Sequence, residues 1–299
     1  MKKAVLIVNP SSGTEKAPEY AEMATQKLKE LFDEVIVKYT EKDGDAMRFA
    51  QAAAQEQVHS VFVMGGDGTV NEGISGLAEQ PYRPTFGFFP LGTVNDLARA
   101  LRIPLDPQEA IGSLAIDRTR PLDIGKVNDK FFMNVVSVGT IPEALNEVES
   151  EDKTKWGKMA YFISAIRKFS ETQPYFFRVN IDGEEREIQT SIILIGMTNS
   201  IGGFETILPD AEVDDGKLHL IYLKDPTVLE TLKALPDLMK GVDDSTNNVE
   251  YKTFKEMTIE LVDPDGSIRI NVDGDEGDKL PIRVGILPSH LNVYCGIQE

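Results

Sequence analysis

The chain has 299 residues, of which 41% are hydrophobic and 27% are charged, and this composition is typical of globular proteins. Its length predicts two domains with sizeable cores. Acidic residues outnumber lysine and arginine by 49 to 31, so the net charge is −18. That sign excludes a typical nucleic-acid-binding protein. A polyphosphate ligand would have to be held by backbone amides, local cations and metal.

The cysteine and histidine content limits the kinds of metal site and catalytic site that the chain can form. A single cysteine, Cys295, excludes an intramolecular disulfide and a cysteine-based zinc site, and we expect it to pack in a terminal strand. With only three histidines, a histidine-rich metal centre or a Ser-His-Asp triad is disfavoured. No stretch approaches the roughly 18 apolar residues of a membrane span, and no cleavage site follows the apolar run at 4–8. We therefore expect a cytoplasmic protein.

Strand and helix patterns alternate over the first 120 or so residues. Apolar runs predict strands at 4–8, 35–37, 61–64 and 86–89. Helical spacing predicts helices at 20–32, 45–57, 70–78 and 94–101. Asp45 is expected to be the N-cap of the second helix. This alternation indicates a parallel sheet covered by helices.

After about Pro121 short strands dominate. They are expected at 131–138, 176–181, 192–197, 218–223, 257–262, 268–272 and 282–286, with helices at 156–170 and 227–240. Apolar residues alternate in 268–272, which indicates one buried face. The sequence thus predicts an α/β domain over 1–122 with a parallel sheet, followed by a C-terminal β-sandwich domain over 123–289. Residues from about 290 to 299 are expected to pack back on the first domain.

Three loops rich in small residues each follow a strand and precede a helix. They span 9–13, 65–69 and 90–96. Strand carboxyl ends meet at one edge of a parallel sheet, and helix N-termini favour anions there. Three such loops favour nucleotide binding over a purely structural explanation. The sequence has no GxxxxGK[ST] element, and Asn71 breaks the GxGxxG pattern, so neither a Walker loop nor a dinucleotide fingerprint is present.

Two local features allow two interpretations each. The glycines around Asp67 fit either a tight hairpin turn or a backbone cradle for phosphate, where a carboxylate needs a cation or donors beside it. Asn95 and Asp96 either cap the following helix or contact a ligand.

GGDGTVNE after a hydrophobic strand resembles the signature of the diacylglycerol kinase catalytic domain, shared with sphingosine kinases and, more distantly, NAD kinases. NPSSG at 9–13 and PLGTVNDLARALRIP are similar to the other nucleotide-side motifs of the bacterial lipid kinases. The resemblance continues through FMNVVSVG, NSIGGFETILPDAEVDDGKLHLIYL and VDGDEGDKLP, and so covers essentially the whole chain. NAD kinases lack the GTxND element combined with this opening, which favours the lipid kinase branch. The implied fold is the NAD kinase/diacylglycerol kinase-like α/β domain with a β-sandwich.

The resemblance implies ATP as the nucleotide. The positions that match the family's nucleotide contacts are Asn9, Pro10, Ser11, Ser12, Gly13, Thr40, Gly66, Asp67, Gly68, Thr69, Val70, Asn71, Glu72 and Thr93.

The resemblance also implies a structural Mg²⁺ at the DDG turn. Matching positions assigns the carboxylate to Asp215 and the two carbonyls to Glu212 and Lys217. Oxygen ligands of this kind suit Mg²⁺. Without the resemblance, DDG predicts only a hairpin turn. A second Mg²⁺, carried by ATP, is expected near Asp67.

The acidic segment 272–281 is where the chain departs from the family. The family has DGE, with glutamate as general base and aspartate orienting it. Here the corresponding positions are Asp273 and Asp275, with Glu276 next in the chain. Aspartate is one methylene shorter, and a misplacement of about 1 Å costs on the order of a hundredfold in rate. We favour Asp275 as the base, with Glu276 as the alternative, and expect Asp278 to lie in a solvated acidic loop.

The expected function is transfer of the ATP γ-phosphoryl group to a lipid hydroxyl in the cleft between the domains, with diacylglycerol as the first candidate and phosphatidic acid as its product. The alternatives are a soluble acceptor such as NAD, or a nucleotide-binding regulator with little turnover. The lipid is expected to be met at the membrane surface, without nucleic acid as a partner. Segment 152–162 is either an interfacial helix or an ordinary packed helix. A homodimer fits the composition no worse than a monomer.

Overall fold

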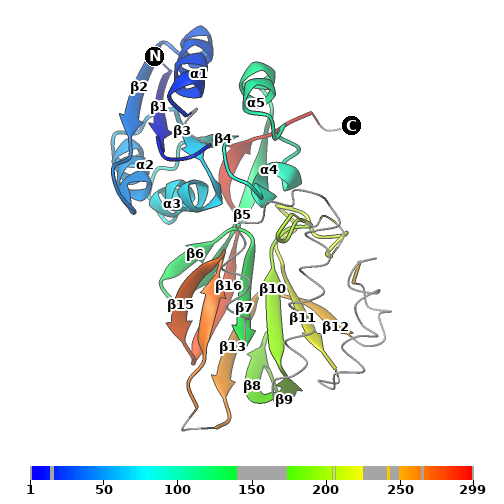
Figure 1. Ribbon diagram of the computed structural model, residues 1–299. Coiled ribbons are helices and arrows are strands. Elements are labelled where there is room, and N and C mark those ends of the chain that lie inside the picture. The colour runs from blue at the N-terminus through cyan, green and yellow to red at the C-terminus, as the bar shows by residue number, and fades with distance from the viewer. Residues whose placement is uncertain are drawn as a thin grey trace.

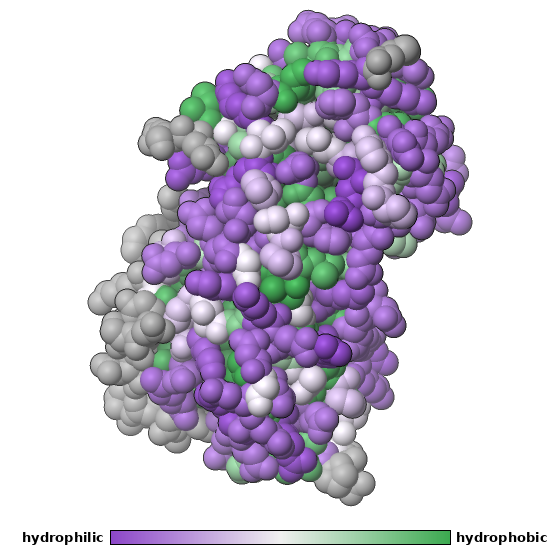
Figure 2. Space-filling model, turned by 180° about the vertical axis from the view of Figure 1, so that it is seen from behind, coloured by the Kyte–Doolittle hydropathy of each residue, from purple (hydrophilic) through white to green (hydrophobic). Residues whose placement is uncertain are grey.

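A computed structural model of the chain describes residues 2–13, 17–139, 174–203, 205, 207–224, 241–242, 249–263 and 266–297. The expected helices at 156–170 and 227–240 and the segment 152–162 lie outside these residues. The structure has two lobes, one with helices around a sheet and one built of strands (Figure 1). The face shown in Figure 2 is mainly hydrophilic, with smaller hydrophobic areas between polar ones. None of the described helices is long and apolar enough to cross a membrane.

The first lobe contains a four-stranded parallel sheet. Its strands are β1 (Lys3–Val8), β2 (Glu34–Tyr39), β3 (Ser60–Gly65) and β4 (Thr85–Pro90), in the order β2-β1-β3-β4. The helices are α1 (Ala17–Leu31), α2 (Asp45–Gln55), α3 (Asp67–Leu77), α4 (Asp96–Ala100) and α5 (Pro107–Ser113). Strands β1, β3 and β4 are continuous apolar runs because helices cover both of their faces.

Alternate residues of β1 enter two different cores. Val5 and Ile7 pack with α2 and α3 on one face of the sheet. Leu6 and Val8 pack with α1 and α5 on the other. This alternation is the two-residue period of a strand, and it places the helices in layers on either side of the sheet.

The second lobe is a sandwich of two sheets around one core. Its strands are β5 (Thr119–Val127), β6 (Lys130–Phe132), β7 (Val135–Gly139), β8 (Tyr175–Ile181), β9 (Glu184–Thr190), β10 (Ile192–Gly196), β11 (Leu218–Leu223), β12 (Val249–Phe254), β13 (Glu256–Leu261), β14 (Arg269–Val272), β15 (Asp275–Lys279) and β16 (Ile282–Tyr294). One sheet has the order β12-β11-β10-β7-β14-β15, and the other contains β16-β13-β8-β9. Apolar side chains from both sheets form the core between them. The predicted fold class, a parallel α/β domain followed by a β-sandwich, is confirmed.

Strand β16 joins the two lobes into one sheet. It pairs with β13 near its start, runs antiparallel to β5, and reaches β4 at Val293, opposite Phe86. The register with β5 shifts between Leu287 and Leu291, so the strand bulges there. Residues 290–294, part of the segment that we expected on the first domain, lie in the end of this strand beside β4 and β5.

Several local expectations need correction. Gly44, not Asp45, is the N-cap of α2, with a left-handed φ of 82°. The Asp45 carboxylate instead accepts the backbone N–H groups of Glu41 and Lys42, in the turn before the helix. The segment 131–138 is not one strand, since it breaks between β6 and β7.

Four strands and one helix were missed from the sequence, for identifiable reasons. Strands β9 (EEREIQT) and β15 (DEGDK) lie at sheet edges and carry charged residues, so they lack an apolar run. Strands β5 and β12 mix polar and apolar residues. Helix α5 had a readable signal, because Asp106 caps it by accepting from Gln108 and Glu109 N–H, and Pro107 begins it.

Tyr294 fastens the end of β16 to the first lobe, and its replacement tests that attachment. Its ring stacks on Phe62 with 5.2 Å between centroids, and its hydroxyl lies 2.8 Å from Ser60 Oγ. We expect Tyr294→Ala to lower the free energy of unfolding by about 3–5 kcal/mol through the cavity it leaves. Tyr294→Phe, which loses only the hydrogen bond, should cost about 1 kcal/mol. Urea unfolding measures both, and equal losses would contradict the importance of ring packing.

Candidate functional site

The three glycine-rich loops meet at the carboxyl edge of the parallel sheet. Asn9 Nδ2 donates to Thr69 Oγ1 at 3.0 Å, which joins the first loop to the second. Leu91 N donates to Gly65 O at 2.8 Å, which joins the second to the third. The side chains of Ser11 and Thr93 are exposed at this edge. The predicted convergence of the loops is therefore present.

Close approach explains part of the glycine content of the second loop. A Cβ on Gly65 would lie 2.6 Å from Thr69 Cβ, and a Cβ on Gly66 would lie 3.3 Å from the Cα of Gly92. Gly68 is different, because a Cβ there would meet nothing within 4 Å. The loop is thus packed tightly on its inner side and open at Gly68, where α3 begins and its first N–H groups can receive an anion.

Asp67 holds the third loop in place. Its carboxylate accepts Asn95 N–H at 2.9 Å and Asp96 N–H at 3.1 Å. Burial raises the pKa of the Asp67 carboxyl, and the nearby Asp96 charge adds to this effect, while the amide hydrogen bonds oppose it. A tight hairpin turn does not describe this segment, since Gly66 is the N-cap of α3.

The structure bears on the capping role of Asn95 and Asp96, and their contact with a ligand stays a prediction. Asn95 is the N-cap of α4 by position, yet its side chain accepts Gly92 N–H and donates to Gly92 O instead of capping the helix. The Asp96 carboxylate reaches the second lobe. It accepts from the Ser200 hydroxyl at 2.6 Å and from Gly202 and Gly203 N–H at 2.8 Å each.

Glu72 lies one turn into α3 and binds the start of α2. Its carboxylate accepts Gly44 N–H at 2.9 Å and Ala46 N–H at 3.1 Å. A carboxylate at a helix N-terminus is favourable because of the helix dipole. Thr40 lies nearby at the end of β2, where its N–H donates to Val8 O.

The remaining predicted nucleotide residues lie in the first loop and in the first turn of α3. Ser12 N–H donates to Asn9 O, and Gly13 has a left-handed φ of 71°. Pro10 is half-buried in the same turn. Val70 is buried in the core, so only its backbone faces the loop, and Asn71 Oδ1 accepts from the Ser75 hydroxyl at 3.5 Å.

The acidic segment forms the hairpin between β14 and β15 and reaches the same place from the second lobe. Asp273 and Gly274 are its two turn residues, both with positive φ. The Asp273 carboxylate accepts three backbone N–H groups, from Met133 at 2.7 Å, Asn134 at 2.9 Å and Val135 at 2.8 Å. The three donors lie where the chain passes from β6 to β7, so Asp273 binds the backbone at the point where the two strands are interrupted.

The pKa of Asp273 links the two lobes electrostatically. Loss of hydration on burial raises this pKa from 3.8 to about 6, against the three amide hydrogen bonds that lower it. The negative charge of Asp67 raises it further. The fold therefore places the charge of Asp67 within electrostatic range of Asp273, although 206 residues separate them in the chain (273 minus 67).

Strand alternation separates Asp275 from Glu276. Val272 pairs with Asp275 and Asn271 with Glu276, so each pair shares a face of the sheet. Val272 belongs to the sandwich core, so Asp275 lies on the core face, at the exposed end beside the turn. Glu276 lies on the opposite face, 3.0 Å from Arg269. Asp278 is in β15, not in a loop as expected, and accepts from Asn128 Nδ2 at 2.9 Å.

The turn at 212–217 is held from three sides. Asp123 accepts Gly216 N–H at 2.7 Å and Ser289 N–H at 2.6 Å. Arg120 donates to the carboxylates of Asp214 and Glu212. Asp215 Oδ1 accepts Lys217 N–H at 2.8 Å, and its Oδ2 lies 2.9 Å from His219 Nε2.

This donor set fits the expected Mg²⁺. No group of three or more acidic, cysteine or histidine side chains suited to a metal occurs within the described ranges. The predicted set needs only one carboxylate, Asp215, with the carbonyls of Glu212 and Lys217, and hard oxygens of this kind with retained water suit Mg²⁺.

Four residues of this site were missed from the sequence. They are Asp123, Arg120, His219 and Ser200. Asp123 could have been found, because it is a carboxylate inside a strand that is otherwise buried around it. Arg120 and Ser200 have partners 92 and 104 residues away, which local patterns do not reveal, whereas His219 is only four residues from Asp215.

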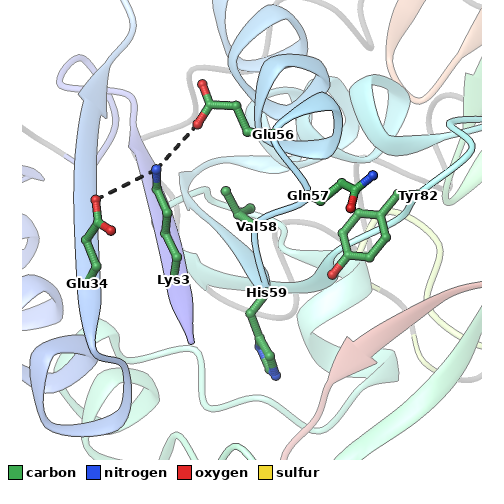
Figure 3. Close-up of a pocket in the computed structure, with 7 residues that line it drawn as sticks. All are labelled: Lys3, Glu34, Glu56, Gln57, Val58, His59 and Tyr82. Atoms are coloured by element: carbon green, nitrogen blue, oxygen red, sulfur yellow. Dashed lines mark hydrogen bonds and ion pairs between the residues drawn. The ribbon is translucent and has the colours of Figure 1, made fainter. Parts of the chain in front are cut away.

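A pocket of about 380 Å³ lies elsewhere, at the opposite edge of the parallel sheet (Figure 3). It is lined by Lys3, Glu34, Glu56, Gln57, Val58, His59 and Tyr82. Lys3, Glu34 and His59 lie at or just before the amino ends of β1, β2 and β3. Lys3 Nζ bridges Glu56 at 3.4 Å and Glu34 at 3.7 Å. None of the predicted site residues lines it.

Comparison with known proteins agrees with this architecture. Residues 3–127 match the family model described as the diacylglycerol kinase catalytic domain. Residues 134–295 match the model described as the YegS C-terminal NAD kinase beta sandwich-like domain.

Relatives match over the full length. The chain is 38% identical over 299 residues, the whole of both chains, to a Streptococcus pneumoniae protein described as "Putative lipid kinase". It is 34% identical to a diacylglycerol kinase of Staphylococcus carnosus, over 98% of this chain and 95% of that one. A crystal structure described as "a putative diacylglycerol kinase" from Bacillus anthracis has a TM-score of 0.85 and 27% identity, covering 99% of this chain and 95% of that one.

The fold and the two matching family models identify a lipid kinase built of an α/β lobe and a β-sandwich lobe. The chain belongs to the diacylglycerol kinase catalytic-domain family, whose members are phosphotransferases.

The raised pKa of Asp273 is directly measurable. We expect its carboxyl to titrate near pH 6 in ¹³C NMR of aspartate-labelled protein, with the signal assigned by its loss in Asp273→Asn. Asp67→Asn should lower that pKa, because one negative neighbour is removed. Since the folded-state pKa lies above the usual 3.8, the protonated group favours folding, and this contribution is lost as the pH rises through about 6. Titration near 3.8 in the wild type would contradict the burial of this group.

Proposed function

We propose that the protein transfers the γ-phosphoryl group of ATP to a lipid hydroxyl, with diacylglycerol as the acceptor and phosphatidic acid as the product. The observation that carries this proposal is the meeting of the three glycine-rich loops at one edge of the sheet, which Asp96 joins to the second lobe at Ser200 and the glycines after it. Phosphoryl transfer depends on positioning and charge neutralisation. The loops would supply the positioning, and charge neutralisation would come from Mg²⁺.

The nucleotide-side loops supply the positioning. The N-terminus of α3 is open at Gly68, and its dipole favours the phosphates. The hydroxyls of Ser11 and Thr93 are exposed beside it and can donate to phosphate oxygens. Asp67 keeps the third loop, which carries Thr93, in register with the second.

Mg²⁺ would have two places. Asp215, with the carbonyls of Glu212 and Lys217, would hold a structural ion, and the ATP-bound ion would lie near Asp67. Bound Mg²⁺ neutralises charge on the phosphates and braces the turn. Asp67 Oδ2 accepts Asn95 N–H and Oδ1 accepts Asp96 N–H, and a carboxylate oxygen has a second acceptor position.

Asp275 is the proposed general base. It lies at the end of β15 next to the turn residue Asp273, on the core face of the sheet, so it can accept the proton of the acceptor hydroxyl. Asp273 acts by holding the hairpin against residues 133–135. Glu276 faces away and is engaged by Arg269.

A labelled-ATP assay separates the candidate acceptors. Purified protein with Mg²⁺ is incubated with mixed micelles containing diacylglycerol or other lipids, and with soluble NAD in a separate arm. Label in phosphatidic acid is the expected result. Label only in NAD would replace the lipid acceptor by a soluble one. Binding of ATP without transfer to any acceptor would leave a nucleotide-binding regulator.

Asp67→Ala is expected to abolish transfer. Removal of the carboxylate leaves the Asn95 and Asp96 N–H groups without their acceptor and releases the third loop, so the rate should fall by at least about a hundredfold. Asp278→Ala, in the same acidic segment but bound to Asn128, is the matched control and should retain activity. Activity of Asp67→Ala within a few-fold of wild type would remove Asp67 from the site.

The base assignment is tested by two isosteric changes. Asp275→Asn should lower kcat by about 10²- to 10⁴-fold, the usual contribution of a general base, with little change in KM. Glu276→Gln should stay close to wild type, because its side chain lies on the other face of the sheet. The reverse pattern, measured with the same lipid acceptor, would transfer the role to Glu276.

A further inference from the structure

The side chain of His219 links the DDG turn to the sandwich. His219 lies in β11 and is 2% exposed. Both of its ring nitrogens have a partner. Nδ1 lies 2.8 Å from the Tyr251 hydroxyl, and Nε2 lies 2.9 Å from Asp215 Oδ2. The His219 and Tyr251 rings also stack, with 5.9 Å between centroids. The sequence patterns used for the function do not include either residue.

Hydrogen-bond chemistry sets the direction of this chain. An ionised carboxylate can only accept, so the bond to Asp215 requires a proton on Nε2. Nδ1 of the neutral ring is then an acceptor, and the Tyr251 hydroxyl donates to it. The donors therefore run from Tyr251 through His219 to Asp215. The acceptor-only carboxylate selects the tautomer, and Tyr251 holds the ring by its bond to Nδ1.

These bonds fix the orientation of the Asp215 carboxylate. Oδ2 is held by His219 and Oδ1 by Lys217 N–H at 2.8 Å, so the group cannot rotate without losing a partner. The two other carboxylates of the turn, Asp214 and Glu212, are bound by Arg120. Asp215 Oδ2 also accepts Glu212 N–H at 3.5 Å, so Oδ1 is the Asp215 oxygen that keeps a lone pair for a cation.

We propose that His219 is a positioning residue for a divalent cation at this turn, and that Tyr251 supports it by holding the imidazole ring through Nδ1 and by stacking on it. The inference rests on the Asp215 cation site of the proposed function. Residues that orient a metal ligand in this way typically change metal affinity by about 10- to 100-fold when replaced. His219 does not touch the cation, and its effect is exerted through the Asp215 carboxylate.

The test is calorimetric titration of the full-length protein with Mg²⁺, without ATP or lipid. His219→Gln keeps an N–H donor near the position of Nε2, whereas His219→Asn has a donor only near Nδ1. We expect Asn to weaken Mg²⁺ binding by about 10- to 100-fold and Gln to restore most of the affinity. Tyr251→Phe should give a smaller loss, because the ring loses its hydrogen bond at Nδ1 but keeps the bond to Asp215 and the stacking partner.

The outcomes distinguish this inference from the function it rests on. Wild-type protein that binds no Mg²⁺, with Asp215→Asn unchanged, would overturn the cation site itself. Wild-type binding that Asp215→Asn removes but His219→Asn preserves would overturn the role of His219 alone. Thermal unfolding without Mg²⁺ provides the structural control. If Gln and Asn lower Tm and Mg²⁺ affinity equally, His219 is merely a packed residue.

Discussion

Carboxylates that accept backbone N–H groups from distant segments are the interactions on which this site depends. Asp67 binds the start of α4, Asp123 binds the DDG turn and the β16 bulge, and Asp273 binds the break between β6 and β7. A hydrogen bond to a charged group contributes about 1.5–3 kcal/mol, which offsets part of the cost of removing the carboxylate from water. The raised pKa values of Asp67, Asp123 and Asp273 show that this compensation is incomplete.

The same interactions connect the lobes. Asp67 holds the backbone of Asp96, and the Asp96 side chain holds Ser200 and the glycines after it. The loop that carries Asp67 is therefore connected to the second lobe by two successive carboxylates, Asp67 and Asp96. Strand β16 adds a second, covalent connection, since it crosses both lobes beside β5. These connections fix the proposed phosphate-binding loops in position relative to the lobe that carries the proposed base, Asp275.

Much of the fold and the positions of the candidate loops could be predicted, because apolar periodicity and glycine-rich helix starts are visible within short stretches of sequence. The buried parallel strands are apolar runs, and the loop at 65–69 combines glycines with the start of a helix. Edge strands such as β15 were missed because exposed charge replaces the apolar period there. The N-cap of α2 was misassigned because the Asp45 carboxylate accepts from the preceding turn, a geometry that its position alone does not distinguish from capping.

The sequence by itself determined the alternation of strands and helices, the edge at which the glycine loops meet, and the segments that carry the acidic groups. These follow from apolar periodicity and backbone chemistry, which act over a few residues. Only the tertiary structure decided the roles of individual carboxylates. It placed the charge of Asp67 within electrostatic range of Asp273 and turned Asp275 and Glu276 to opposite faces of a strand. It also placed His219 within hydrogen-bond distance of Asp215. The first outcome joins groups far apart in the chain. The other two depend on how β15 and β11 pair in their sheet, because that pairing decides which face each side chain occupies.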